Sequence, residues 1–151
     1  MCEMSAGQKM KIRRLTLLDY EKMAEIWKRS GLPFKPKGRD SKASIKKQIK
    51  ETPDLILGAE ENDELVGVIV ASTEGRKGWL NRIAVVPEKR GKGIAKALIR
   101  KAEEALRERE IKIIGLLIHK SNSTSIKLAK SLGYIPAPEI LYLTKRESDD
   151  V

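Results

Sequence analysis

The residues best suited to chemistry lie in a short basic loop that contains two glycines. The loop consists of Arg90, Gly91, Lys92, Gly93, Ile94, Ala95 and Lys96. An apolar, β-branched stretch over residues 79–86 precedes it, and an amphipathic helical pattern follows it. A strand that turns into a helix leaves backbone N–H groups open at the helix N-terminus, where the helix dipole favours negative charge. Since glycine also lets an anion approach the backbone, the loop predicts a cradle for a pyrophosphate.

Two better-known phosphate motifs do not fit this loop. A dinucleotide fingerprint needs a glycine or an alanine where this chain has Lys96, and no acidic residue ends a following strand at the expected distance. The Walker pattern G-x-x-x-x-G-K-[ST] is absent from the sequence. An ordinary strand-to-helix turn with solvated lysines is the alternative interpretation of the loop.

The loop does match the pattern R-x-x-G-x-A through Arg90, Gly93 and Ala95, and it follows a strand that ends in Val86-Pro87. In this setting it resembles the signature loop of the GNAT family of acyl-CoA N-acyltransferases. A second segment, 122–134, resembles the family pattern N-x-x-A-x-x-L-Y-x-x-x-G-F/Y. The matching residues there are Asn122, Ile126, Leu128, Gly133 and Tyr134. The resemblance covers nearly the whole chain, from residue 11 to residue 145.

The resemblance implies that acetyl-CoA is the co-substrate and that its acetyl group passes directly to a primary amine. Residues 90–96 would then hold the pyrophosphate, and Asn122 would contact the pantetheine arm. The acyl group and the upper part of that arm would be lined by Ile83, Ala84 and Val85. The Val85 N–H would polarise the thioester carbonyl. The acceptor is a protein N-terminus, a lysine or a small amine, and the sequence does not distinguish them.

Two positions depart from the family pattern, and both concern proton transfer. Ala129 stands where a tyrosine commonly protonates the leaving thiolate, and Leu117 stands where many relatives have a glutamate base. An amine with a pKa of about 10 must lose a proton before it attacks. His119, the only histidine, is the candidate base, because an unperturbed histidine has a pKa of about 6.5. Tyr142 and Tyr134 are the remaining hydroxyls that can act as the acid.

Each catalytic assignment has a simpler alternative. His119 is otherwise a polar residue at a strand end, the two tyrosines are otherwise packing residues, and water can carry the protons. Without the two usual side chains, a non-catalytic acyl-CoA-binding sensor is the alternative function. A nucleic-acid binder is a third class, but only the formal net charge of +10 favours it. No helix-turn-helix, zinc finger or aromatic-basic RNA motif is present.

The hydrophobic periodicity predicts the elements that position these residues. Residues 11–15 form a strand, and Thr16 and Asp19 form a capping box at the start of a helix. Ser41 begins a second helix, which Pro53 closes. The later predicted elements are a hairpin (54–60 and 64–72), a strand (79–86), a long helix from residue 94, a strand (111–119), a helix (122–132) and two last strands (134–135 and 140–145).

This order of elements predicts an α/β (α+β) fold. It combines a mixed, mostly antiparallel sheet with flanking helices and one parallel crossover through the long helix, as the GNAT resemblance also implies. In that family the segment between the first two helices shapes the acceptor pocket. Phe34, Arg39 and Asp40 are therefore candidates for substrate contact, and a solvated loop is the alternative.

Length and composition predict one domain of 151 residues with a core of aliphatic side chains. We expect a disordered tail over 1–10, a single domain over 11–146 and a loose acidic tail over 147–151. One cysteine, Cys2, forms no internal disulfide, and nothing is spaced to bind zinc. No apolar run is long enough for a membrane span. We expect a cytoplasmic monomer or homodimer that binds no metal, no membrane and no specific nucleic acid.

Overall fold

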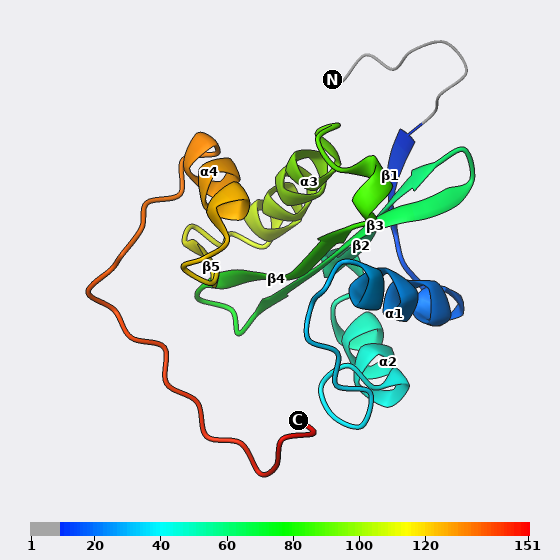
Figure 1. Ribbon diagram of the computed structural model, residues 1–151, viewed down its shortest axis with the longest axis horizontal. Coiled ribbons are helices and arrows are strands. Elements are labelled where there is room, and N and C mark those ends of the chain that lie inside the picture. Colours follow the sequence, from blue (N-terminus) through cyan, green and yellow to red (C-terminus); the bar gives the residue numbers. More distant parts are fainter. Residues whose placement is uncertain (1–9) are drawn as a thin grey trace.

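The computed structural model of the chain describes residues 10–151. The tail predicted over residues 1–9 lies outside this range. Met10, which the sequence predicts to be part of the same tail, instead begins the first strand, because it pairs with Glu61 of the neighbouring strand. Figure 1 shows the sheet running between two groups of helices.

Five strands form one sheet in the spatial order β1-β2-β3-β4-β5. The strands β1 (Met10–Arg14), β2 (Ile56–Glu61), β3 (Glu64–Thr73) and β4 (Gly78–Val85) are antiparallel neighbours, and β5 (Ile114–Leu116) runs parallel to β4. A parallel neighbour needs a crossover, which α3 (Ile94–Glu108) supplies. The structure thus confirms the predicted mixed sheet with one parallel crossover.

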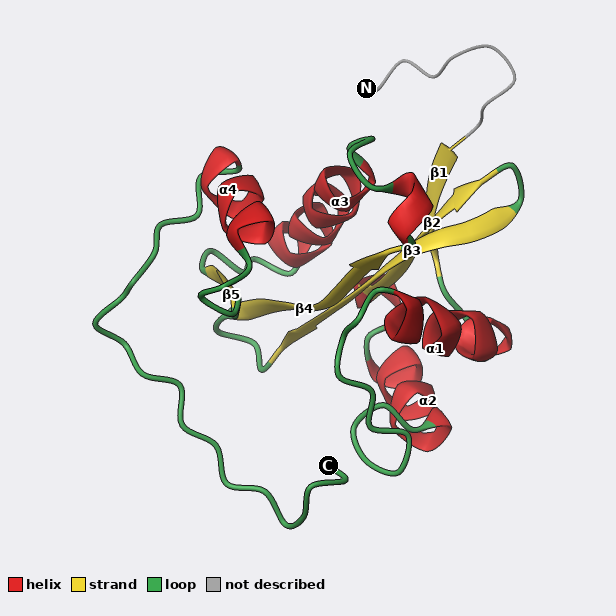
Figure 2. Cartoon of the chain, viewed as in Figure 1, coloured by secondary structure: helices red, strands yellow, loops and turns green. Residues whose placement is uncertain are grey.

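The helices cover both faces of the sheet (Figure 2). On one side lie α1 (Tyr20–Arg29) and α2 (Lys42–Glu51), and on the other lie α3 and α4 (Ser123–Ser131). Short 3-10 turns precede α1 (η1, Leu17–Asp19), follow α2 (η2, Pro53–Leu55) and follow β4 (η3, Pro87–Lys89). The helices α1 and α3 bury an apolar stripe against the sheet, and α2 packs against η1 and η2. The fully buried side chains include Met23, Ile26 and Trp27 of α1, Ile45 of α2, and Leu98, Ala102 and Leu106 of α3.

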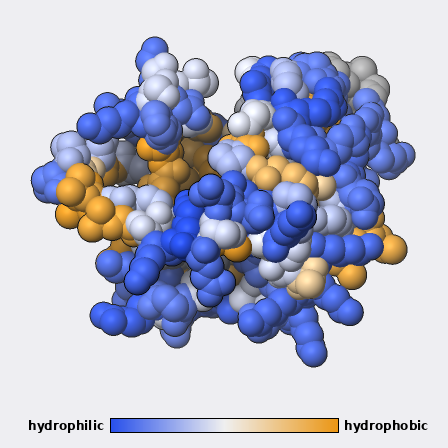
Figure 3. Space-filling model, turned by 60° about the horizontal axis from the view of Figure 1, so that its bottom comes forward, coloured by the Kyte–Doolittle hydropathy of each residue, from blue (hydrophilic) through white to orange (hydrophobic). Residues whose placement is uncertain are grey.

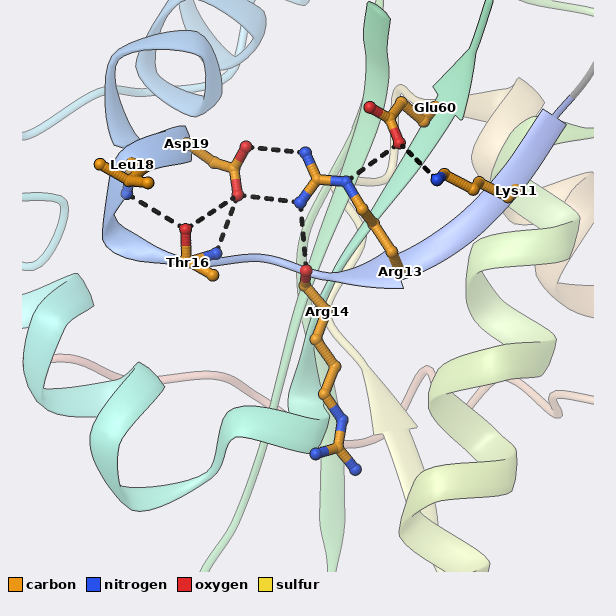
Figure 4. Close-up of polar contacts among 7 residues, drawn as sticks. All are labelled: Lys11, Arg13, Arg14, Thr16, Leu18, Asp19 and Glu60. Atoms are coloured by element: carbon orange, nitrogen blue, oxygen red, sulfur yellow. Dashed lines mark hydrogen bonds and ion pairs between the residues drawn. The ribbon is translucent and has the colours of Figure 1, made fainter. Parts of the chain in front are cut away.

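A charged network fixes the first strand to the turn that follows it, and Figure 4 shows Arg13 at its centre. The Arg13 guanidinium donates to both carboxylate oxygens of Asp19, at 3.0 and 2.8 Å, and to Glu60 of β2 at 3.1 Å. Asp19 also accepts the backbone N–H of Thr16 at 2.8 Å, and the Thr16 hydroxyl accepts the N–H of Leu18 at 3.3 Å. The predicted capping box is confirmed, and Arg13 ties it to two strands.

The strand predicted over 111–119 is shorter in the structure, where β5 covers only Ile114–Leu116. Its partner β4 begins at Gly78, so residues before Ile114 have no ladder to join. At the other end, an irregularity in the β3–β4 register bends β4 after Leu80, and β4 carries no β5 partner beyond the Leu80–Leu116 pair. The two strands therefore diverge near the middle of β4.

The last two predicted strands, over 134–135 and 140–145, are wrong for this structure. No residue that it describes after Leu116 belongs to a strand. Pro136 and Pro138 lack a backbone N–H, so they cannot continue a ladder from Tyr134. The segment runs along the left and lower edge of the molecule (Figure 1).

The C-terminal segment leaves large apolar side chains in contact with solvent. Leu141 and Leu143 are 79% and 84% exposed, and Ile135 is 90% exposed. Figure 3 shows hydrophobic surface around a hollow on the left of the molecule, the side that carries β5 and this segment. The tail beyond it, predicted to be loose, contacts the loop between α1 and α2, where Lys35 Nζ donates to the carbonyl oxygen of Asp149.

Within residues 10–151, no helix combines the length and the apolar composition that crossing a bilayer requires. The predicted cytoplasmic location stays a prediction from the sequence.

Candidate functional site

The basic loop has the strand–turn–helix geometry that the sequence predicts. After β4 and η3, Arg90 is extended, and Gly91 and Gly93 have φ values of +78° and +80°. These values lie in the left-handed region that glycine adopts without strain. A Cβ added to either glycine would meet no atom within 4 Å, so backbone conformation rather than space requires glycine here. Helix α3 begins directly afterwards at Ile94.

The N-terminus of α3 is open. Its N-cap is Gly93, which has no side chain to bond the first N–H groups, and its first turn contains no acidic residue. The first bond into the helix runs from the Ala97 N–H to the Gly93 carbonyl, at 3.0 Å. The N–H groups of Ile94, Ala95 and Lys96 have no preceding helical carbonyl to bond, so they can bind an anion.

Some of the cationic side chains in and next to the loop already have partners, so they are not free to bind such an anion. Lys89 Nζ lies 2.6 Å from Glu61 Oε1, and this hydrogen-bonded ion pair raises the pKa of Lys89 and lowers that of Glu61. Arg90 donates to the Ser30 carbonyl at 3.2 Å. These contacts anchor the loop to β2 and to the end of α1. The side chains of Lys92 and Lys96 stay exposed beside the open helix end, where they can contact phosphate oxygens.

The end of β4 presents one backbone N–H to the gap between β4 and β5. Val85 lies opposite Gly67 of β3, and the Val86 N–H donates to the Val66 carbonyl at 2.9 Å. In an antiparallel ladder this pattern makes Val85–Gly67 a non-hydrogen-bonded pair, so the Val85 N–H points away from β3. It therefore points to the side on which β5 has already ended. Ala84 and Val85 are buried and Ile83 is half-buried along the same stretch.

His119 is exposed and lies beyond β5 rather than at its end. Leu117 and His119 therefore lie outside the strand, although both fall within the range predicted for it. The ring nitrogen Nδ1 accepts the backbone N–H of Ser121 at 3.2 Å and lies 2.7 Å from the Ser121 hydroxyl oxygen. The only histidine of the chain thus has a hydroxyl directly beside one ring nitrogen.

The second segment that resembles the family pattern forms the predicted helix. The Asn122 side chain caps α4 by accepting the Ser125 N–H at 3.2 Å. Ala129, at the position of the usual tyrosine, is buried. The Tyr134 hydroxyl donates to Glu103 of α3 at 2.7 Å, and burial together with this carboxylate raises the pKa of the tyrosine. Tyr134 therefore joins the end of α4 to α3.

Tyr142 is 68% exposed in the C-terminal segment. That segment follows the lower left edge of the molecule, whereas the N-terminus of α3 lies at the top of the same view (Figure 1). The structure does not bring Tyr142 beside the basic loop.

One residue of the site was not singled out from the sequence. Arg82 lies within β4, in the stretch that reads as an apolar strand, and its φ is +50°. Its guanidinium lies over the Trp27 ring, 4.8 Å from the ring centroid, and 3.1 Å from Asp40 Oδ2. Asp40, a candidate from the segment between α1 and α2, is only 2% exposed, and Phe34 packs beside Trp27 with ring centroids 6.2 Å apart.

Comparison with known families gives one match that spans most of the chain. The model of the acetyltransferase (GNAT) family matches residues 20–134. An acetyltransferase of Sodalis glossinidius is 33% identical over 141 residues, which cover 93% of this chain and 98% of that relative. An acetyltransferase of Photorhabdus laumondii is 35% identical over 125 residues, which cover 83% of this chain and 86% of that relative.

Solved structures share the fold. The PaiA N-acetyltransferase of Thermoplasma acidophilum, solved in complex with coenzyme A, has a TM-score of 0.73 and 25% identity, and the match covers 83% of this chain and 89% of that one. A predicted acetyltransferase of Clostridium acetobutylicum, solved with acetyl-CoA, has a TM-score of 0.67 and 22% identity, with 90% and 96% of the two chains covered. These structures hold coenzyme A or acetyl-CoA on the same fold.

Proposed function

Since this chain belongs to the GNAT family of acetyltransferases, we propose that it moves an acetyl group directly from acetyl-CoA to a primary amine. The acceptor is a protein N-terminus, a lysine side chain or a small amine. The amine nitrogen bonds to the thioester carbonyl carbon while the C–S bond breaks. The amine loses one proton in this step, and the departing thiolate gains one. The protein must therefore hold the coenzyme, stabilise the carbonyl oxygen and move protons.

One observation supports the proposal most strongly: two sets of open backbone N–H groups lie at the two ends of the segment 85–96. At one end, the Val85 N–H points into the gap between β4 and β5, where it can donate to the thioester oxygen as negative charge develops. At the other end, the uncapped N-terminus of α3 can bind the pyrophosphate, with Lys92 and Lys96 beside it. Ile83 to Val85 line the acyl group and the pantetheine arm.

His119 is the proposed base. Because Nδ1 faces the Ser121 hydroxyl at 2.7 Å, the amine proton reaches the ring through that hydroxyl. Tyr142, the proposed acid, lies in the exposed C-terminal segment, and it serves only if that segment closes over the site. A thioester is already activated, so placing both reactants in line supplies much of the rate enhancement even without a strong acid.

Turnover measurements test this function directly. Release of coenzyme A from acetyl-CoA is followed with a panel that contains lysine-bearing peptides, peptides with free N-termini and small polyamines. We expect release that depends on one class of amine and a product that carries the acetyl group on nitrogen. Binding of acetyl-CoA without turnover of any amine would instead identify a non-catalytic acyl-CoA sensor.

A further inference from the structure

Arg82 has a backbone conformation that its residue type disfavours. Its φ of +50° occurs where the β3–β4 register shifts, between the Val70–Asn81 and Val68–Ala84 pairs. A bulge of this kind redirects a side chain that would otherwise follow the strand alternation. Strained residues of this type cluster at binding and active sites, and this one comes directly before Ile83 to Val85.

The guanidinium of Arg82 is buried without the hydrogen bonds that burial normally requires. Its side chain is 15% exposed, and neither Nε nor Nη2 has a hydrogen-bond partner among the described residues. All the buried side-chain nitrogen and oxygen atoms without a partner in residues 10–151 belong to Arg82 and to the Trp27 ring beneath it. Buried polar groups are almost always paired, so this concentration at one place needs an explanation.

The two unpartnered atoms form one edge of the guanidinium. Elsewhere in this chain the same edge binds a carboxylate in two parallel bonds, since Arg109 donates from Nε and Nη2 to the two oxygens of Asp54 at 2.8 and 2.6 Å. Nε and Nη2 match the spacing of two carboxylate oxygens. The corresponding Nε–Nη2 edge of Arg82 donates no hydrogen bond to any side chain that the structure describes.

Asp40 does not fill this edge. Its Oδ2 forms an ion pair with Nη2 at 3.1 Å but no hydrogen bond, and it accepts the Lys35 backbone N–H at 2.8 Å. Burial is the main cause that lowers the pKa of Arg82. The attraction of Asp40 acts in the opposite direction, and the nearby Arg39 guanidinium lowers this pKa further. Arg82 thus has one carboxylate, Asp40, and one further guanidinium, Arg39, in its vicinity.

We propose that the acceptor carries a carboxylate, which binds the Nε–Nη2 edge of Arg82 with Arg39 beside it. This inference rests on the N-acetyltransferase function proposed above. The Arg82 edge lies just past the last β4–β5 pair, Leu80–Leu116, on the strand that leads to the Val85 N–H. A carboxylate held there places a nearby amine at the thioester. Both donors are shielded from solvent, so the proposal requires the side chains around them to shift when the acceptor enters.

The chemistry fits a free amino acid or a peptide that begins with an acidic residue. Two pairs of acceptors distinguish these sources: free amino acids against their amides, and peptides with N-terminal glutamate against the same peptides with glutamine. Neutralising a free amino acid to its amide makes the amine easier to deprotonate. Intrinsic reactivity therefore favours the amide, and a preference for the acid must come from binding.

The experiment measures kcat/KM for both pairs with the unmodified protein and with Arg82→Gln, Arg82→Lys and Arg76→Gln. Arg76 is exposed in the turn between β3 and β4, and its variant has the same change in net charge. We expect the unmodified protein and Arg76→Gln to prefer the carboxylate member of one pair at least about 10-fold. The preference falls to about one in Arg82→Gln, and Arg82→Lys restores only part of it because lysine lacks the two-donor edge.

The result that overturns the inference is equal kcat/KM for both members of both pairs in the unmodified protein, which requires no variant to fold. An unchanged preference in Arg82→Gln overturns it as well. Acetyl-CoA affinity is measured alongside. If acetyl-CoA binds but no carboxylate preference is found, only this inference fails, whereas failure to bind acetyl-CoA removes the proposed function itself.

Discussion

In the basic loop, glycine is required by the backbone conformation and not by a lack of space. Gly91 and Gly93 both have left-handed backbone conformations in open surroundings. Any other residue there is strained, and its side chain would lie next to the open N-terminus of α3. Arg90 and Lys89, by contrast, contact α1 and β2 and hold the loop in place. Anchoring and anion binding are thus divided between neighbouring residues.

Gly93→Glu should abolish acetyl-CoA binding. Glutamate is strained at a φ of +80°, and its carboxylate repels the pyrophosphate at the end of α3. Gly75→Glu is a matched control, because Gly75 has a φ of +101°, equally open surroundings and a position at the far end of β4. Calorimetry should show affinity reduced at least about 100-fold in the first variant and unchanged in the second. Micromolar binding retained by Gly93→Glu would overturn the pyrophosphate cradle.

His119→Gln should lower kcat about 100-fold while the affinity for acetyl-CoA stays the same, since a positioned base contributes about that much. Ser121→Ala should lower kcat as well, because it removes the hydroxyl 2.7 Å from Nδ1. Lys120→Gln, which changes the exposed residue between them, is the control. Single-turnover kinetics separates the chemical step from coenzyme release. An unchanged kcat in His119→Gln at every pH would remove His119 as the base.

The secondary-structure elements position the site through a few polar connections. The network around Arg13 fixes β1, β2 and the start of η1 relative to one another (Figure 4). The Tyr134–Glu103 bond does the same for α4 and α3. Changes in these contacts should therefore act on stability first.

Asp19→Asn should destabilise the fold by about 1–3 kcal/mol near neutral pH, since Asp19 accepts bonds from Arg13 and Thr16. The Arg13 guanidinium lowers the pKa of the Asp19 carboxyl in the folded state. The stabilising contribution is therefore complete above the unfolded pKa of about 3.9, and it is lost as the pH falls through the lower folded value.

Urea unfolding at a series of pH values checks this sign. The difference in unfolding free energy between the unmodified protein and Asp19→Asn should shrink as the pH falls below about 4. Glu51→Gln, at an exposed residue of α2, is the control and should differ little from the unmodified protein throughout. A difference for Asp19→Asn that stays constant down to about pH 2 would show that the charge of Asp19 contributes nothing.

For the whole molecule, local patterns predicted most of the fold. The Thr16–Asp19 capping box and the glycine loop were predictable because their residues are neighbours in sequence. The pairing of Arg82 with Asp40 was not, because it joins residues far apart and depends on a bulge that the alternation of strand residues does not reveal. The last strands failed for a related reason, since residues 140–145 have strand-like types but no strand edge beside them.

In the proposed reaction, the two substrates are bound by elements on opposite faces of the sheet. Helix α3 contributes the coenzyme end, and the loop between α1 and α2 contributes Asp40 and Arg39 to the acceptor end. The part of β4 beyond its last pair with β5, Leu80–Leu116, connects the coenzyme end to the acceptor end. Binding of acetyl-CoA is the first requirement of this arrangement, and every other assignment depends on it.

Calorimetric titration of the unmodified protein with acetyl-CoA, with NADH and ATP as controls, tests that requirement most directly. The open N-terminus of α3 and the Val85 N–H predict micromolar binding of acetyl-CoA and no comparable heat from NADH or ATP, because only acetyl-CoA places a pyrophosphate and a thioester at the two ends of one segment. Absence of acetyl-CoA binding, or equal binding of all three ligands, would contradict the coenzyme site at residues 85–96.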